Sequence, residues 1–271
     1  MNPRIQACFA SLAKQSRQAL IPYVTAGYPE CATTVPLMHA MVAAGADLIE
    51  LGVPFSDPMA DGPVIQAAGD VALAQGVGMK DVLAFVTEFR QTDTKTPIVL
   101  MGYTNPVERY GLDRFMNDAK TSGVDGLVVV DTPPEESLEL AQKCRDKAMD
   151  LIFFLAPTST DERVKMVAEV ASGYVYYVSM RGVTGAGHMD MGEVLAKVTH
   201  LKKSLPLPVG VGFGIRDAQG AKTIAGVADA IIIGTKIIQL LGEGPLDQAI
   251  GRVSEFVSGV RAAMDTSRVA A

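Results

Sequence analysis

Short, almost uninterrupted apolar runs alternate along this chain with longer segments in which apolar residues recur at helical spacing. Runs that are apolar throughout are typical of strands in a parallel sheet buried on both faces. The predicted strands are Ala19–Thr25, Ala46–Gly52, Pro97–Met101, Gly126–Val130, Leu151–Leu155, Tyr174–Val178, Val209–Val211 and Ala230–Ile233. The chain is therefore expected to form eight strands, each followed by at least one helix.

The segments between these runs carry apolar residues on one helical face. They predict helices at Ile5–Leu20, ahead of the first strand, and at Ala32–Ala44, Val64–Ala74, Val82–Phe89, Leu112–Lys120, Leu138–Lys147, Asp161–Val170, Met191–Leu201, Ala218–Ile224 and Pro245–Met264. Residues 102–106 are expected to be a loop that closes the third strand. Eight such units in roughly 250 residues favour a single (β/α)8 TIM barrel over residues 1–271, with an extra N-terminal helix.

Local sequence around the strands supports this architecture over an open dinucleotide-binding sheet. The turn after the first strand reads Thr-Ala-Gly-Tyr-Pro at 25–29, which is not the GxGxxG turn that a Rossmann fold needs. Four of the helix-to-strand junctions share an aspartate at the same place, which is expected to form a turn. These are Asp47, Asp125, Asp150 and Asp229.

Composition and charge narrow the classes of function. The net charge is −6 without a basic run, which argues against a nucleic-acid partner. No apolar run approaches the ~18 to 20 residues of a membrane span. Cys8, Cys31 and Cys144 form no CxxC pair, so a reducing, cytoplasmic location is expected. The three histidines are scattered, which leaves little for a metal site or a Ser-His-Asp triad.

The stretch 48–66 breaks the apolar pattern at the end of the second strand. Glu50 shares a strand face with Leu48 and Gly52, and Asp57 and Asp61 follow on a proline-rich loop. Each acid alone would suit an ion pair or a turn. Three acids at the carboxyl end of one strand favour a role in catalysis, because TIM-barrel active sites lie there.

The two carboxyl groups are expected to differ in ionisation. Burial among apolar neighbours should raise the pKa of Glu50, so that it carries a proton near neutral pH. Asp61, on a more open loop, should stay ionised more easily and hold a ring N–H or a developing cation. Such a pair suits proton-assisted bond cleavage without a metal or a Schiff base.

Glycine-rich segments end the last two strands. Gly212-Phe213-Gly214 and Gly234-Thr235 each lead into a helix, where backbone N–H groups can bind a phosphate; the alternative is that they only form tight turns. The loop 181–188 contains three glycines and is interpreted as a lid, or else as a plain connector. Lys236 is the only lysine near a strand end with the chemistry to form a Schiff base; the alternative is that it begins a short helix.

At these residues the chain resembles the alpha subunit of tryptophan synthase. Residues 48–63 read Leu-Ile-Glu-Leu-Gly-Val-Pro-Phe-Ser-Asp-Pro-Met-Ala-Asp-Gly-Pro and match the signature of that family almost throughout. The segments 182–185, 212–214 and 234–235 follow in the expected order and spacing, so the resemblance covers essentially the whole chain.

The resemblance implies a retro-aldol cleavage of indole-3-glycerol phosphate to indole and glyceraldehyde 3-phosphate. Glu50 would move the proton between the C3′ hydroxyl and indole C3, Asp61 would hold the indole N–H, and Thr184 would contact Asp61 when the lid closes. The substrate-binding residues it implies are Tyr23, Tyr103, Tyr174, Tyr176, Thr184, Gly185, Phe213, Gly214, Gly234 and Thr235.

The resemblance also implies a partner. The family works as an αββα complex in which indole passes to a pyridoxal-phosphate-dependent beta subunit, and no cofactor is expected in this chain. Pro54, Asp57 and Asn105 match the loops that face the partner. Three alternatives stay open: another phosphosugar isomerase or Schiff-base aldolase using Lys236, a non-catalytic module that only activates a beta subunit, and a free-standing lyase that releases indole.

Overall fold

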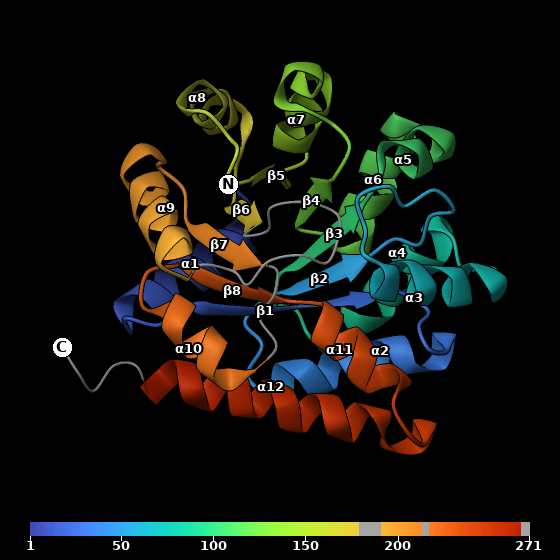
Figure 1. The fold of residues 1–271 in the computed structure, drawn as a ribbon. Helices are drawn as coiled ribbons and strands as arrows, with labels where there is room; N and C mark the ends of the chain where they lie inside the picture. Colours follow the sequence, from blue (N-terminus) through green and yellow to red (C-terminus); the bar gives the residue numbers. More distant parts are fainter. Residues whose placement is uncertain (179–190, 213–216, 267–271) are drawn as a thin grey trace.

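The computed structural model describes residues 1–178, 191–212 and 217–266, and its eight parallel strands close into a barrel in sequence order. The expected TIM barrel is confirmed (Figure 1). The strands are β1 Ala19–Thr25, β2 Ile49–Gly52, β3 Ile98–Gly102, β4 Gly126–Val129, β5 Asp150–Leu155, β6 Val175–Val178, β7 Val209–Gly212 and β8 Ala230–Ile233. The barrel closes where β1 pairs with β8.

Helices surround the barrel, and α12 runs along α2, α10 and α11 on its outside (Figure 1). The α-helices are α1 Pro3–Lys14, α2 Cys31–Ala43, α3 Pro63–Ala74, α4 Met79–Phe89, α5 Thr104–Tyr110, α6 Leu112–Ser122, α7 Leu138–Asp146, α8 Asp161–Val170, α9 Met191–Ser204, α10 Ala218–Ala225, α11 Thr235–Gly242 and α12 Ala249–Thr266. Two short 3-10 helices, η1 Pro134–Glu136 and η2 Leu246–Gln248, lie in the loops. Within these described ranges, no helix is long and apolar enough to cross a membrane.

Three local expectations were wrong. The segment expected as a loop at 102–106 contains the start of α5, in which Pro106 lies in the first turn, where its missing N–H costs no helical bond. The first helix ends at Lys14 instead of Leu20, because the chain turns at Ser16, which has a φ of 52°. The last helix begins at Ala249, after η2, and not at 245.

Apolar side chains form two shells, one inside the barrel and one between its strands and the helices. The inner cluster takes alternate residues of the strands, and Ile5 and Leu12 of α1 join it. Helix α1 therefore closes the end of the barrel at which the strands begin. The opposite end, where the strands finish, is left for polar side chains.

The aspartates at the helix-to-strand junctions bridge neighbouring strands. Carboxylates of Asp47, Asp125 and Asp229 accept hydrogen bonds from the backbone N–H of Leu20, Ile98 and Val209, respectively, each 2.9 Å long. Each bond reaches the beginning of the preceding strand. These aspartates thus hold adjacent strands together, which the expected turn-forming role did not include.

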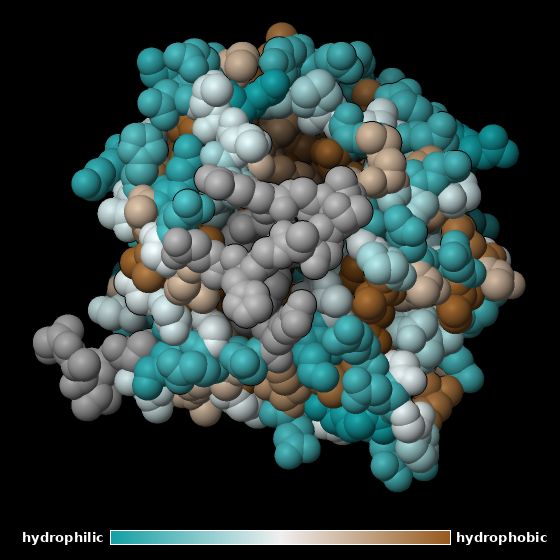
Figure 2. Space-filling model, in the orientation of Figure 1, coloured by the Kyte–Doolittle hydropathy of each residue, from teal (hydrophilic) through white to brown (hydrophobic). Residues whose placement is uncertain are grey.

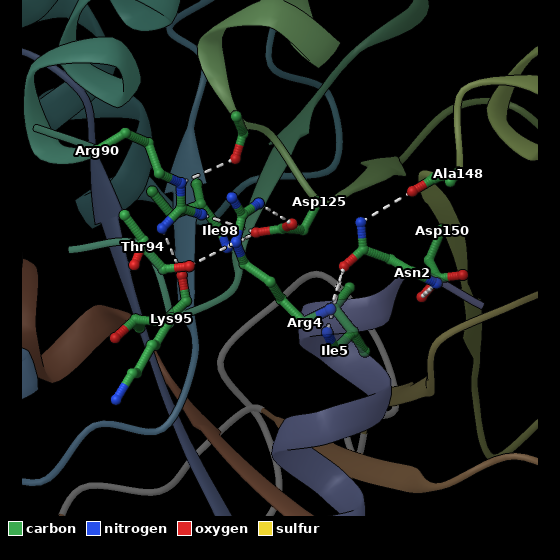
Figure 3. A network of polar contacts seen from close by, with 12 residues as sticks. Asn2, Arg4, Ile5, Arg90, Thr94, Lys95, Ile98, Asp125, Ala148 and Asp150 are labelled. Atoms are coloured by element: carbon green, nitrogen blue, oxygen red, sulfur yellow. Dashed lines mark hydrogen bonds and ion pairs between the residues drawn. The ribbon is translucent and has the colours of Figure 1, made fainter.

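Asp125 is the centre of the polar network in Figure 3. Its fully buried carboxylate binds Arg4 of α1 at 2.8 Å and Arg90 at 2.7 Å. The Arg90 side chain is 9% exposed, whereas Arg4 is 35% exposed. The network ties α1 to the base of the barrel, close to the site where Asn2 binds Asp150 and Ala148.

Candidate active site

Glu50 lies inside the barrel at the carboxyl end of β2. Leu48, two residues earlier, belongs to the inner cluster, so Glu50 projects to the same side. In the register of the sheet Glu50 lies between Tyr23 of β1 and Val99 of β3. The side chain is fully buried, as its position among apolar residues predicts.

The two carboxylate oxygens of Glu50 have different surroundings. Oε1 accepts a 2.5 Å hydrogen bond from the hydroxyl of Tyr174, which is itself fully buried. Oε2 is buried and has no hydrogen-bond partner in the described part of the chain. Burial raises the pKa of Glu50 to about 7, while the Tyr174 bond acts in the opposite direction. Glu50 can therefore gain or lose a proton near neutral pH, as expected from the sequence.

Asp61 lies on the β2–α3 loop and is held in place by its neighbours. Gln66 of α3 donates a 2.8 Å hydrogen bond to the Asp61 carbonyl. Burial raises the pKa of the Asp61 carboxyl, and the nearby Tyr103 hydroxyl lowers it. The loop is thus less open at Asp61 than we expected, but Tyr103 still favours the ionised form.

Tyrosines fill the mouth of the barrel and account for two of its glycines. A Cβ on Gly52 would lie 2.2 Å from the Tyr23 hydroxyl, and one on Gly212 would lie 2.1 Å from the Tyr176 hydroxyl. Gly234, at the start of α11, also packs against Tyr23, with 3.1 Å from an added Cβ to the ring. Glycine is required at the first two positions because tyrosine hydroxyls occupy the space.

The residues expected to face a partner come together on the outside of this end. Pro54, Asp57 and Asn105 line one groove of about 620 Å³. The rest of its lining is mostly apolar and comes from the β2–α3 loop, α3, the α3–α4 loop, α4 and α5, namely Phe55, Ser56, Leu73, Val77, Gly78, Met79, Pro106, Arg109 and Tyr110. Met59, on the same loop, is 80% exposed.

Some expected site residues lie outside the described ranges. These are Thr184, Gly185, Phe213 and Gly214, together with the loop interpreted as a lid. Figure 2 shows a recess in the surface with hydrophobic residues at its bottom. Of the proposed phosphate-binding residues, Gly234 and Thr235 are described, and they form the N-cap and first residue of α11.

The Schiff-base alternative loses support from the geometry. Lys236 lies 3.8 Å from Glu243 in an ion pair, whereas a Schiff-base lysine needs a desolvated or cationic environment. No group of three or more potential metal ligands occurs among the residues that the structure describes.

Sequence reasoning assigned no role to two residues that shape the site. Gln66 was part of the acidic stretch but had no assigned role; its position four residues into α3 was the available signal. Asp131, at the end of β4, accepts 2.8 Å bonds from the Thr104 backbone and hydroxyl, and so caps α5 from a neighbouring loop. Because α5 itself was not predicted, nothing indicated this contact.

Comparison with known proteins adds independent information on this arrangement. The family model described as tryptophan synthase alpha chain matches residues 9–265. The tryptophan synthase alpha chain of Cupriavidus taiwanensis is 58% identical over 262 residues, covering 97% of this chain and 99% of that protein. That of Burkholderia multivorans is 55% identical over 262 residues, with 97% of each chain covered. The crystal structure of tryptophan synthase subunit alpha from Legionella pneumophila superposes with a TM-score of 0.91 at 39% identity, covering 98% of this chain and 99% of that one.

Proposed function

Because this chain belongs to the tryptophan synthase alpha chain family, whose reaction is the lyase cleavage of indole-3-glycerol phosphate, we propose that Glu50 and Asp61 perform that cleavage here. The observation that carries this assignment is the carboxylate of Glu50. It is fully buried at the end of a barrel strand, with Tyr174 on one oxygen and no hydrogen-bond partner on the other within the described ranges. An unpaired buried oxygen of this kind is suited to a substrate group.

The reaction needs one group that both accepts and returns a proton. Glu50 moves a proton from the C3′ hydroxyl to C3 of the indole ring. The C3–C3′ bond then breaks, its electrons return to the ring and the hydroxyl carbon becomes the aldehyde of glyceraldehyde 3-phosphate. A pKa of about 7 lets Glu50 work in both directions near neutral pH.

Asp61 stabilises the charge that this proton creates on the ring. Protonation at C3 leaves a positive charge on the ring nitrogen, and an ionised carboxylate beside the N–H offsets it. The Tyr103 contact supports this role because it favours the charged form of Asp61. Tyr23, Tyr103, Tyr174 and Tyr176 surround the indole ring in this proposal.

Phosphate is assigned to the ends of β7 and β8, at the same mouth of the barrel. The N-terminus of α11 at Gly234 and Thr235, together with the glycine segment after β7, offers backbone N–H groups to the anion. Thr184, Gly185, Phe213 and Gly214 complete the substrate contacts in this proposal.

The groove is proposed as the docking surface for a tryptophan synthase beta subunit in an αββα assembly. Its support is that Pro54, Asp57 and Asn105, which are separate in the sequence, line the same mostly apolar groove. Pyridoxal phosphate would belong to that partner, and indole would pass to it. The three free cysteines support a cytoplasmic location for the assembly.

An assay of indole release from indole-3-glycerol phosphate tests the proposal, run with and without a tryptophan synthase beta chain from the organism of a relative. We expect release by this chain alone, faster release with the partner, and loss of both in Glu50→Gln. Activity that persists in Glu50→Gln would refute the catalytic assignment. Indole release at the same rate with and without the partner would favour a free-standing lyase, and borohydride trapping of a substrate adduct would favour the Schiff-base alternative.

A further inference from the structure

Tyr103 is in contact with both the catalytic loop and the proposed docking groove. Its hydroxyl accepts a 3.1 Å hydrogen bond from the backbone N–H of Ala60 and faces the carboxylate of the next residue, Asp61. One side chain therefore determines both the backbone and the carboxylate position at the end of this loop. Tyr103 is 3% exposed, so almost all of its surface packs against neighbouring residues.

The ring of Tyr103 is directed to the groove. It packs against Phe55 with ring centroids 5.3 Å apart, and Phe55 is part of the groove lining. Tyr103 is also the N-cap of α5, whose residues Asn105 and Arg109 line the other wall. An occupant of the groove consequently touches both segments that Tyr103 joins.

We propose that Tyr103 is a positioning residue that passes occupancy of the groove to Asp61. A partner seated on Phe55 and the start of α5 restrains the ring of Tyr103, and so keeps its hydroxyl against Ala60 and Asp61. Partner binding then supplies the free energy that positions Asp61 for the ring N–H, and substrate binding does not have to supply it. This inference rests on the proposed function, because it takes the groove as the docking surface and Asp61 as a substrate contact.

Tyr103→Phe tests it, because this variant loses the hydroxyl and keeps the ring against Phe55. Indole release is measured with and without the beta chain, and partner affinity is measured by titration. We expect affinity within about threefold of the unsubstituted protein, while the acceleration by the partner falls at least fivefold. A residue with only a packing role would lower both rates by the same factor and leave the acceleration unchanged. Tyr28→Phe is the matched control, since it removes a hydroxyl from the β1–α2 loop at the same end of the barrel, and it should keep full acceleration.

Amide hydrogen exchange at Ala60 gives a second readout that does not depend on turnover. The partner should slow exchange at Ala60 at least threefold in the unsubstituted protein and in Tyr28→Phe, but not in Tyr103→Phe. Equal acceleration in Tyr103→Phe, or unchanged Ala60 exchange on partner binding, would overturn the inference. Affinity reduced more than tenfold in Tyr103→Phe would also overturn it, by making Tyr103 part of the docking surface. Failure of the partner to bind or accelerate the unsubstituted protein would instead refute the proposed docking, and the coupling with it.

Discussion

The Tyr174 hydroxyl donates a 2.5 Å hydrogen bond to Oε1 of Glu50, although the two residues are 124 positions apart in the chain. Both side chains are fully buried, and the bond is the only described one that opposes the effect of burial on the Glu50 pKa. The pair thus determines how readily Glu50 is ionised inside the barrel.

Tyr174→Phe should shift the pH dependence of indole release. The bond stabilises the ionised carboxylate, so its loss raises the pKa of Glu50 above about 7. We expect the acidic limb of the kcat profile to move to higher pH, with a loss of about tenfold to 100-fold at pH 6.5, since hydrogen bonds to charged groups contribute about 1.5 to 3 kcal/mol, or roughly one to two pKa units. Tyr177→Phe, three residues further along the chain in β6, is the comparison variant. A profile that keeps its acidic limb would mean that Glu50 does not control it.

Glu50→Gln should abolish turnover and stabilise the folded protein at alkaline pH. The pKa of Glu50 is raised from 4.5 to about 7, so the folded state retains a proton that the unfolded chain has lost between these values. The contribution of Glu50 to the free energy of unfolding is therefore fully present below pH 4.5 and is lost as pH rises through 7. At about 1.4 kcal/mol per pKa unit, the free energy of unfolding should be up to about 3 kcal/mol greater in the variant at pH 8.

Urea denaturation of both proteins at pH 8 and pH 5 measures this difference. The gap between the two proteins should shrink at pH 5, where the carboxyl of Glu50 is protonated in the folded state. A gap that is the same at both pH values would contradict the raised pKa.

Asp61→Asn should reduce kcat for indole release by at least about 100-fold, the usual effect of removing a group that stabilises charge in the transition state. A neutral amide keeps the size of the side chain but does not offset the charge on the ring. Because the amide can still contact Tyr103, KM should change less than kcat. Steady-state kinetics measure the separate effects on kcat and KM, and normal kinetics would assign Asp61 to loop structure alone.

Asp57→Lys should weaken binding of a beta chain by about tenfold or more, because the substitution reverses a charge on the wall of the proposed docking groove. The effect should diminish at high salt. Asp247→Lys makes the same charge change at an exposed position in η2 and should leave affinity unaltered. Isothermal titration with both variants separates a local effect from one of net charge, and equal affinities would remove the groove as the docking surface.

Asp125→Ala should lower the free energy of unfolding by about 3 to 5 kcal/mol, the cost of leaving a buried charge unpaired. The charge is that of Arg90, and the variant also loses the acceptor for the Ile98 N–H. Arg4→Met should cost less, since Arg4 is 35% exposed. Chemical denaturation ranks the two variants, and a larger loss from Arg4→Met would contradict the network in Figure 3.

Much of the barrel follows from local sequence because its signals are local. Apolar runs and helical spacing depend on residues within one segment, so all eight strands were predicted within a few residues of their observed bounds. Helix α5 was missed because its stabilising contacts are not local. Its seven residues include Pro106, and Asp131 from another loop caps it. A helix stabilised from outside its own segment leaves little pattern within it.

The candidate site likewise has a part that local sequence predicts and a part that it does not. Glu50 and Asp61 stand eleven positions apart on one strand and its loop, so the alternation of β2 and the position of the turn were enough to predict them together. Two features of the site depend on the closure of the barrel. One is the hydroxyl that bonds to Glu50, and the other is the position of Tyr23, which leaves no room for a side chain at residue 52. Closure brings β6 opposite β2 and sets the register of β1 against β2, and both arise from packing of side chains far apart in the chain. The sequence by itself determined the acids and the strand that carries them; the tertiary structure decided their hydrogen-bond partners, and through burial it decided the pKa of Glu50.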